Sequence, residues 1–113
     1  MDNCIFCKII KGEIPSTRLY EDDEMIIIKD VAPQMPIHYL MIPKEHFKTI
    51  DEMNAMQGEI LGRCFYKLGQ MKEKLGLSGG YRLIMNQGED ACQTVPHLHV
   101  HILAGKKLAE KMC

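Results

Sequence analysis

Three histidines near the C-terminal end of the chain alternate with apolar residues, because residues 97–103 read HLHVHIL. Successive side chains of a strand point to opposite faces, so a strand here would place His97, His99 and His101 on one face, about 6–7 Å apart. That spacing suits one nucleophile flanked by two helpers, since a neutral imidazole is nucleophilic near pH 7. It suits three ligands of one zinc ion poorly, because ligands about 2 Å from the metal are rarely more than about 4 Å apart.

The simpler interpretation of these histidines is a solvated polar strand face, where Thr, Lys or Glu would serve equally well. The chain has only five histidines, however, and three of them fall within five residues at a period of two. The pattern therefore indicates a functional face.

A second group with chemical potential is the Cys-x-x-Cys pair formed by Cys4 and Cys7. Five cysteines are an odd number, and the first residues lack a signal-peptide pattern, so we expect a cytoplasmic protein. In a reducing compartment such a pair indicates a metal clip or a redox pair before a structural disulfide. Structural zinc sites need four ligands, so the pair alone is incomplete. Semi-buried thiols are the plain alternative, and a thioredoxin-like pair is disfavoured because no strand precedes the motif.

The elements that must position these groups can be predicted from periodicity. Residues 4–11 read as a short helix stopped by Gly12, and residues 51–75 as one long amphipathic helix capped by Gly76. The predicted strands cover residues 16–21, 25–29, 38–42, 81–85 and 97–103. The sequence therefore predicts an α+β fold, an antiparallel five-stranded meander with one long helix packed on it.

Length and composition limit the classes of protein that remain. A chain of 113 residues is one domain, residues 1–113, and 46% hydrophobic with 26% charged residues is ordinary for a globular protein. A formal net charge of −1 argues against a protein that binds nucleic acid by neutralising many phosphates. The apolar stretches are too short to span a membrane, so we expect no membrane partner.

The sequence resembles the histidine-triad (HIT) nucleotide-binding family, in particular its Hint (protein kinase C-interacting protein-like) branch. The signature His, apolar, His, apolar, His, two apolars is met at residues 97–103. The resemblance runs in unbroken order over roughly residues 4–105, with further matches at residues 5–10, 13–15, 20–23, 30–34, 38–46, 80–88 and 93–94.

The resemblance implies a HIT-like fold and a hydrolase that acts on the α-phosphorus of AMP or GMP derivatives, typically phosphoramidates or acyl adenylates. It implies that His99 forms a covalent nucleotidyl-histidine, that His101 contacts the α-phosphate and that His38 lies beside the nucleophile. Thr94 takes the place of a serine that is common in this branch and contacts the phosphate or the leaving group. A binding or protein-interaction module with little turnover, and a dinucleoside polyphosphate hydrolase, remain the alternatives.

The same resemblance implies the nucleotide-binding residues. Asp30 would bind the ribose hydroxyls, Asn86 and Gln93 would lie in the phosphate pocket together with Thr94, His99 and His101, and an apolar clamp on the base would comprise Ile5, Phe6 and Ile9. Without the resemblance, Asp30 and Asn86 are equally explained as turn formers, and the clamp residues as core.

Some members of the family bind zinc, and by resemblance the ligands here would be Cys4, Cys7, His46 and His97. Such a structural zinc ion would join distant parts of the chain. The resemblance also implies a homodimer in which the long helix and the fourth strand pair across a two-fold axis. Residues 106–113 depart from the tail of the animal proteins, and tails in this branch contribute to the choice of leaving group.

Overall fold

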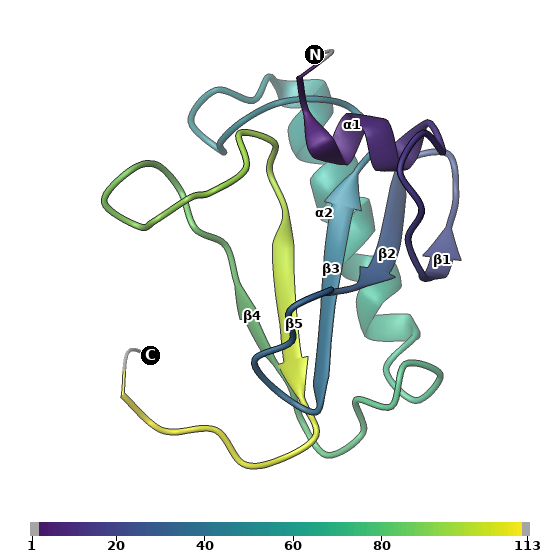
Figure 1. Ribbon diagram of the computed structural model, residues 1–113, viewed down its shortest axis with the longest axis vertical. Coiled ribbons are helices and arrows are strands. Elements are labelled where there is room, and N and C mark those ends of the chain that lie inside the picture. The colour runs from purple at the N-terminus through teal and green to yellow at the C-terminus, as the bar shows by residue number, and fades with distance from the viewer. Residues whose placement is uncertain (1–2, 112–113) are drawn as a thin grey trace.

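The computed structural model describes residues 3–111, and this part of the chain forms an antiparallel sheet with two helices (Figure 1). The elements follow in the order α1 (Ile5–Ile10), β1 (Arg18–Glu21), β2 (Met25–Lys29), β3 (Ile37–Pro43), α2 (Ala55–Gln70), β4 (Arg82–Ile84) and β5 (Val100–Ala104). The predicted α+β class with five strands is confirmed. Within residues 3–111 the two helices are too short and too polar to cross a bilayer.

The order of the strands differs from the predicted meander. The sheet reads β1-β2-β3-β5-β4, so the last strand is inserted between β3 and β4 (Figure 1). Val100 and Ile102 of β5 are fully buried, and this position gives the strand a partner on both sides. The three-residue β4 is left at the edge, where a short strand leaves few unpaired backbone groups.

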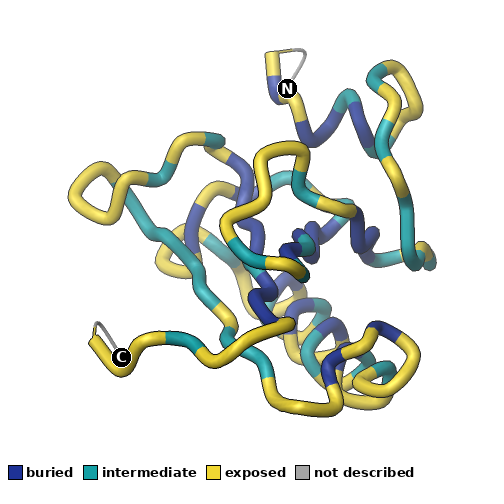
Figure 2. The backbone as a smooth tube through the Cα atoms, turned by 60° about the horizontal axis from the view of Figure 1, so that its bottom comes forward, coloured by how far each residue is buried: buried dark blue, intermediate teal, exposed yellow. Residues whose placement is uncertain are grey.

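The two helices cover opposite faces of the sheet. Cys64 and Leu68 of α2 pack in one apolar cluster with Met25, Ile27, Met41, Val100 and Ile102. Phe6 and Ile9 of α1 pack in a second cluster with Ile26, Ile28, Leu40 and Ile42. Because strand side chains alternate, His38 and His101 lie on the α1 face. Figure 2 shows the buried positions along the centre of the molecule and the exposed ones along the loops.

The long helix is shorter than the predicted span 51–75. A capping box starts it at Ala55, because the Asn54 side chain accepts the Gln57 N–H and the Gln57 side chain accepts the Asn54 N–H. The α-helix ends at Gln70, and irregular turns continue to Gly76. There the amides of Gly76 and Leu77 donate to the carbonyls of Glu73 and Lys72, which is the Schellman pattern expected for a left-handed glycine (φ +77°).

The segment that carries the three alternating histidines is also less regular than predicted, because β5 begins at Val100 rather than at residue 97. The Leu98 N–H donates to the carbonyl of Phe47 in the loop after β3, at 2.8 Å, so residues 97–99 approach the sheet without joining its ladder. Leu98, Val100 and Ile102 are nevertheless fully buried, as their alternation predicts. The smaller differences are that β1 starts at Arg18 and that β4 spans Arg82–Ile84 alone.

The C-terminal tail contacts the edge strand β4 through a hydrogen bond. The guanidinium of Arg82 donates to the carbonyl of Ala109 at 2.8 Å. Of the segment 106–113, residues 112 and 113 are outside the described part of the chain.

Candidate functional site

His99 is held in one tautomer by its own segment. Its Nδ1–H donates to the carbonyl of His97 at 2.8 Å, and a carbonyl can only accept, so Nδ1 carries the proton. The Nε2 atom of the neutral ring then keeps a free lone pair. The side chain is 5% exposed, and burial lowers the pKa of His99, which favours the neutral form near pH 7. These are the properties that a nucleophilic imidazole needs.

His38 and His101 form a hydrogen-bonded pair, and the His101 ring lies beside the His99 ring. They come from the adjacent strands β3 and β5, and His38 Nε2 lies 2.9 Å from His101 Nδ1. The His101 ring packs 5.2 Å from the His99 ring, centroid to centroid. Burial, reinforced by the neighbouring imidazoles of His99 and His38, lowers the pKa of His101. All three rings therefore gather on the face of the sheet opposite α2.

A cavity of about 250 Å³ opens beside the pair and includes Asn86 in its wall. Its lining comprises Gln34, His38, Ile84, Asn86, His101 and Leu103. Asn86 therefore lies beside the histidines, where the phosphate of a nucleotide is expected.

The loop before the triad carries the two other predicted phosphate residues. Thr94 is exposed. Gln93 uses its side-chain amide within the protein: Oε1 accepts the Gly88 N–H, and Nε2 donates to the carbonyls of Lys48 and Val95. The observed role of Gln93 is thus to hold this loop, and its contact with phosphate stays a prediction.

Asp30 stands next to His38. Its Oδ1 accepts the Ala32 N–H at 2.8 Å, an Asx turn, and its Oδ2 lies 3.3 Å from His38 Nε2. The carboxylate also lines a shallow cavity of about 490 Å³ with Ser16, Thr17 and Val31. Asp30 therefore forms a turn and also lines a cavity that is open to a ligand.

The predicted base clamp is divided between core and surface. Phe6 and Ile9 are buried, whereas Ile5 is half exposed. The Phe6 ring meets the rings of both His97 and His99 edge-on, with centroids 5.9 Å and 4.9 Å apart. Phe6 thus packs directly against His99, which its sequence position alone did not predict.

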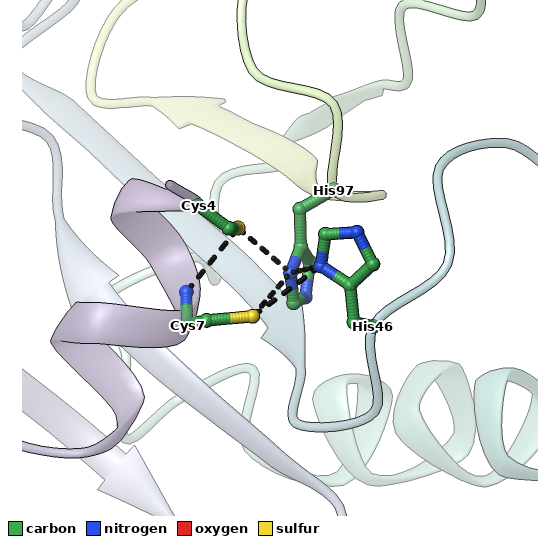
Figure 3. A group of neighbouring side chains, drawn as sticks. All are labelled: Cys4, Cys7, His46 and His97. Carbon is green, nitrogen blue, oxygen red and sulfur yellow. Dashed lines mark hydrogen bonds between the residues drawn. The ribbon is translucent and has the colours of Figure 1, made fainter. Parts of the chain in front are cut away.

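Cys4, Cys7, His46 and His97 come together as predicted, although they are drawn from α1, the loop after β3 and the approach to β5 (Figure 3). Their four ligand atoms lie within 4.8 Å of one another. Cys4 Sγ is 3.4 Å from His97 Nδ1, Cys7 Sγ is 3.3 Å from His46 Nδ1, and the two Nδ1 atoms are 3.1 Å apart. Tetrahedral zinc ligands with bond lengths of about 2.0 Å to nitrogen and 2.3 Å to sulfur lie about 3.3–3.7 Å apart, so the donor set fits zinc.

The hydrogen bond at the far side of His97 supports this fit. His97 Nε2–H donates to the carbonyl of Pro43 at 2.8 Å, which leaves the Nδ1 lone pair for a metal. Burial lowers the pKa of His97 to about 4, so the ring stays neutral. Burial, followed by the influence of Cys4, raises the pKa of the Cys7 thiol. A bound metal would stabilise the Cys7 thiolate and so offset the free-energy cost of deprotonating this thiol.

Sequence reasoning missed two backbone groups that orient these rings. They are the Pro43 carbonyl, which holds His97, and the Gln34 N–H, which donates to His38 Nδ1 at 3.0 Å. Residue identity does not show which backbone groups form such hydrogen bonds. The sequence offered one signal for the Gln34 N–H, the loop marked by Pro33 and Pro36.

Comparisons with known proteins identify a family that the whole described chain resembles. The family model described as "Scavenger mRNA decapping enzyme C-term binding" matches residues 3–112. The chain is 40% identical to a 14 kDa zinc-binding protein of Brassica juncea over 92% of this chain and 94% of that one. It is 39% identical to adenylylsulfatase HINT1 of Arabidopsis thaliana over 92% of this chain and 72% of that one. A HIT family hydrolase structure from Clostridium thermocellum superposes with a TM-score of 0.93 at 46% identity, covering 100% of this chain and 99% of the other.

Proposed function

The chain belongs to the histidine-triad (HIT) family, and we propose that it is a hydrolase that cleaves purine nucleoside 5′-phosphoramidates and related AMP or GMP derivatives at the α-phosphorus. The observation that carries this proposal is the hydrogen bond from His99 Nδ1–H to the His97 carbonyl. It leaves the Nε2 lone pair of a buried, neutral imidazole available for attack.

The proposed reaction has two steps. In the first, His99 Nε2 forms a bond to the α-phosphorus, the P–N bond of the substrate breaks, and the leaving amine takes a proton from water. In the second, a water oxygen bonds to phosphorus, the P–Nε2 bond breaks, and one proton passes to solvent. His99 keeps its Nδ1–H throughout, and the net change consumes one water molecule. His101 and His38 stabilise the phosphate from the side, with Thr94 and Asn86 as further contacts.

We place the nucleoside at the α1 side of the site. Asp30 would accept hydrogen bonds from the ribose hydroxyls, since its Oδ2 is near His38. The base would lie against the apolar residues Ile5, Phe6 and Ile9. Gln93 would act through the loop that it holds.

The test compares wild type with His99→Ala on adenosine 5′-phosphoramidate. We expect wild type to release AMP and, after a rapid acid-free quench, to carry one adenylyl group on the His99 peptide by mass spectrometry. His99→Ala should lose about 10⁴-fold or more in kcat and show no adduct. Asp23→Asn, an exposed change in the β1–β2 turn, is the matched control. A wild-type protein that binds AMP without turnover would instead support the binding module.

The substrate class needs its own comparison because the leaving group is open. The Arabidopsis relative is named an adenylylsulfatase, and adenylyl sulfate is also attacked at the α-phosphorus. Parallel assays with the phosphoramidate, adenylyl sulfate and a diadenosine polyphosphate should give the highest kcat/KM for the phosphoramidate. A higher value for either rival would replace the proposed substrate.

We further propose that Cys4, Cys7, His46 and His97 hold a structural zinc ion, which anchors α1 to the segment that carries His99. The relative named a zinc-binding protein and the fit of the donor set support this. Thiolate ligands require a reducing compartment, in keeping with a cytoplasmic protein. Protein purified without chelator should contain about one zinc per chain, and Cys4→Ser should contain far less. Metal-free wild type would refute the assignment.

A homodimer through α2 and β4 completes the proposal. β4 is an edge strand, and Leu83 on it is 39% exposed. Tyr66 and Met56 of α2 are 69% and 66% exposed, although both are large apolar side chains. Pairing these surfaces across a two-fold axis would continue the sheet and bury them. Sedimentation should give twice the chain mass for wild type and a monomer for Tyr66→Glu, and a monomeric wild type would contradict the proposal.

A further inference from the structure

Cys4, Cys7, His46 and His97 together form the Cys/His cluster. The described residues include a second group of side chains that could bind a metal ion. Asp30, His38 and His101 offer three ligand atoms within 4.8 Å of one another. All three residues belong to the proposed active site, so whether the group takes a cation or a substrate matters. Spacing alone does not decide this, but the hydrogen bonds at the distal ring nitrogens do.

The backbone amide of Gln34 determines the tautomer of His38. The Gln34 N–H lies 3.0 Å from His38 Nδ1, and a backbone amide can only donate. Nδ1 must therefore present its lone pair. A neutral His38 then carries its proton on Nε2.

The proton on His38 Nε2 in turn determines the tautomer of His101. His38 Nε2 lies 2.9 Å from His101 Nδ1 and 3.3 Å from Asp30 Oδ2. Because His38 Nε2 carries the proton, it donates, and His101 Nδ1 accepts through its lone pair. A neutral His101 then carries its own proton on Nε2. The chain of donors thus runs from the Gln34 amide through His38 to His101.

We propose that the main-chain N–H of Gln34 is a positioning group that fixes the Nε2–H tautomers of both His38 and His101. His101 would then offer an N–H, rather than a lone pair, to a phosphate oxygen. This use in the reaction rests on the proposed function, whereas the tautomers do not.

The inference also separates the two ligand groups. His97 donates Nε2–H to a carbonyl, so its Nδ1 lone pair faces the cysteines and suits a metal. His38 receives a donor at Nδ1, so its Nε2 faces Asp30 and His101 with a proton in place. A cation at Asp30, His38 and His101 would need that proton removed from a neutral ring whose other nitrogen already accepts a hydrogen bond. We infer that this group excludes divalent cations while the Cys/His cluster accepts one.

Long-range ¹H–¹⁵N NMR of the histidine rings at pH 7.5 tests the tautomers directly in the wild-type protein. We expect His38 and His101 as Nε2–H tautomers and His99 as the Nδ1–H tautomer. An Nδ1–H signal for neutral His38 or His101 would overturn the inference. The spectrum needs no turnover, so a protein without phosphoramidase activity would still decide it.

The variant Gln34→Pro removes the donor, and Gln34→Ala keeps it while shortening an exposed side chain. Gln34→Ala should retain both Nε2–H tautomers. Gln34→Pro should give mixed tautomers at His38 and His101 and a kcat/KM up to about tenfold below that of Gln34→Ala, the size expected for losing one hydrogen bond between neutral groups. Unchanged tautomers in a folded Gln34→Pro would refute the role of the amide. If that variant does not fold, the wild-type spectrum stands as the test.

Zinc added beyond one equivalent provides the check on cation exclusion. The ring ¹⁵N signals of His38 and His101 should stay in place. A saturable shift of these signals would identify a second cation site and overturn the inference.

Discussion

At the scale of single residues, burial and hydrogen bonding determine what each imidazole can do. Burial lowers the pKa of His97, of His99 and of His101, so all three favour the neutral form. The partner of each ring then decides which nitrogen stays free. A carbonyl on Nε2 leaves the Nδ1 lone pair of His97 free, and a carbonyl on Nδ1 leaves the Nε2 lone pair of His99 free. Under the proposed function, one residue type would serve metal binding and nucleophilic attack within three positions.

The lowered pKa of His99 predicts the acid limb of the pH profile. In the proposed reaction, protonation of His99 would remove the lone pair that attacks phosphorus, so kcat/KM should fall as pH drops through the pKa of His99. Because burial lowers that pKa below 6.5, the value for a free side chain, the midpoint should lie below pH 6.5. AMP release measured between pH 4.5 and 8 checks this.

His101→Gln serves as the control for that profile, because it removes a neighbouring imidazole and leaves His99 in place. The limb should persist in this variant at lower overall activity. A midpoint at or above pH 6.5 in wild type would contradict the expected effect of burial.

At the scale of elements, the β1–β2 turn is tied to α2 through one carboxylate. Asp22 accepts hydrogen bonds from the Tyr20 hydroxyl, the Lys67 ammonium and the amides of Glu24 and Met25. Burial alone would raise the pKa of Asp22, but these donors outweigh it and hold the pKa well below its usual value of 3.8. A carboxyl with a depressed pKa stabilises the fold above its unfolded pKa, and this contribution is lost as pH falls towards the folded pKa.

Asp22→Asn should therefore lower the free energy of unfolding by about 1–2 kcal/mol at pH 7, the range for hydrogen bonds to a charged group after allowance for the partly exposed Lys67. The loss should shrink steadily below about pH 4. Urea unfolding at pH 7 and pH 2.5 measures it, with the exposed Asp23→Asn as the matched control. An equal cost at both pH values would show that the effect is not electrostatic.

The start of α2 offers a second test at this scale. Asn54→Ala removes the side chain that accepts the Gln57 N–H and should cost about 1 kcal/mol of unfolding free energy. Asn54→Asp keeps the acceptor and should cost much less. If both variants are equally destabilised, the capping box does not determine where the helix begins.

Two elements show which buried positions can be predicted from sequence patterns and which cannot. Alternation correctly predicted that Leu98, Val100 and Ile102 are buried, because a two-residue period holds even where backbone pairing is incomplete. The predicted amphipathic helix over residues 51–75 includes the apolar Met56, but this side chain is 66% exposed, since the helix begins only after Asn54 and buries Gln57 instead. Apolar spacing does not distinguish a core face from an exposed one.

At the scale of the whole molecule, the sequence could not predict the strand order. The insertion of β5 between β3 and β4 depends on which edges pair, and its effect is to bring His101 beside His38, 63 residues earlier in the chain. The residues of the Cys/His cluster could be predicted from the resemblance to the family, because the groups that come together are side chains. The Gln34 amide was not, because its action depends on the path of the loop from Asp30 to Ile37 rather than on its side chain.

The six-residue α1 is too short to be stable alone, so its place depends on packing and on the Cys/His cluster. The cluster joins α1 to His97, 90 residues away from Cys7, and Phe6 between the two cysteines packs against His99. A zinc ion bound only by the folded chain adds about 4 kcal/mol at a free concentration 1,000 times its dissociation constant. Chelation should then lower Tm by about 15 °C or more in a domain of this size.

Calorimetry with and without a strong chelator measures this shift, and the wild-type Tm should recover when zinc is added back. The exposed Cys92→Ser should show the same shift as wild type, whereas Cys7→Ser should have a low Tm that the chelator does not change. The shift should be accompanied by faster motion of the Phe6 and His99 rings in NMR relaxation, because the tether of α1 is lost. A Tm that is the same for chelated and zinc-loaded wild type would show that packing alone holds α1 against His99.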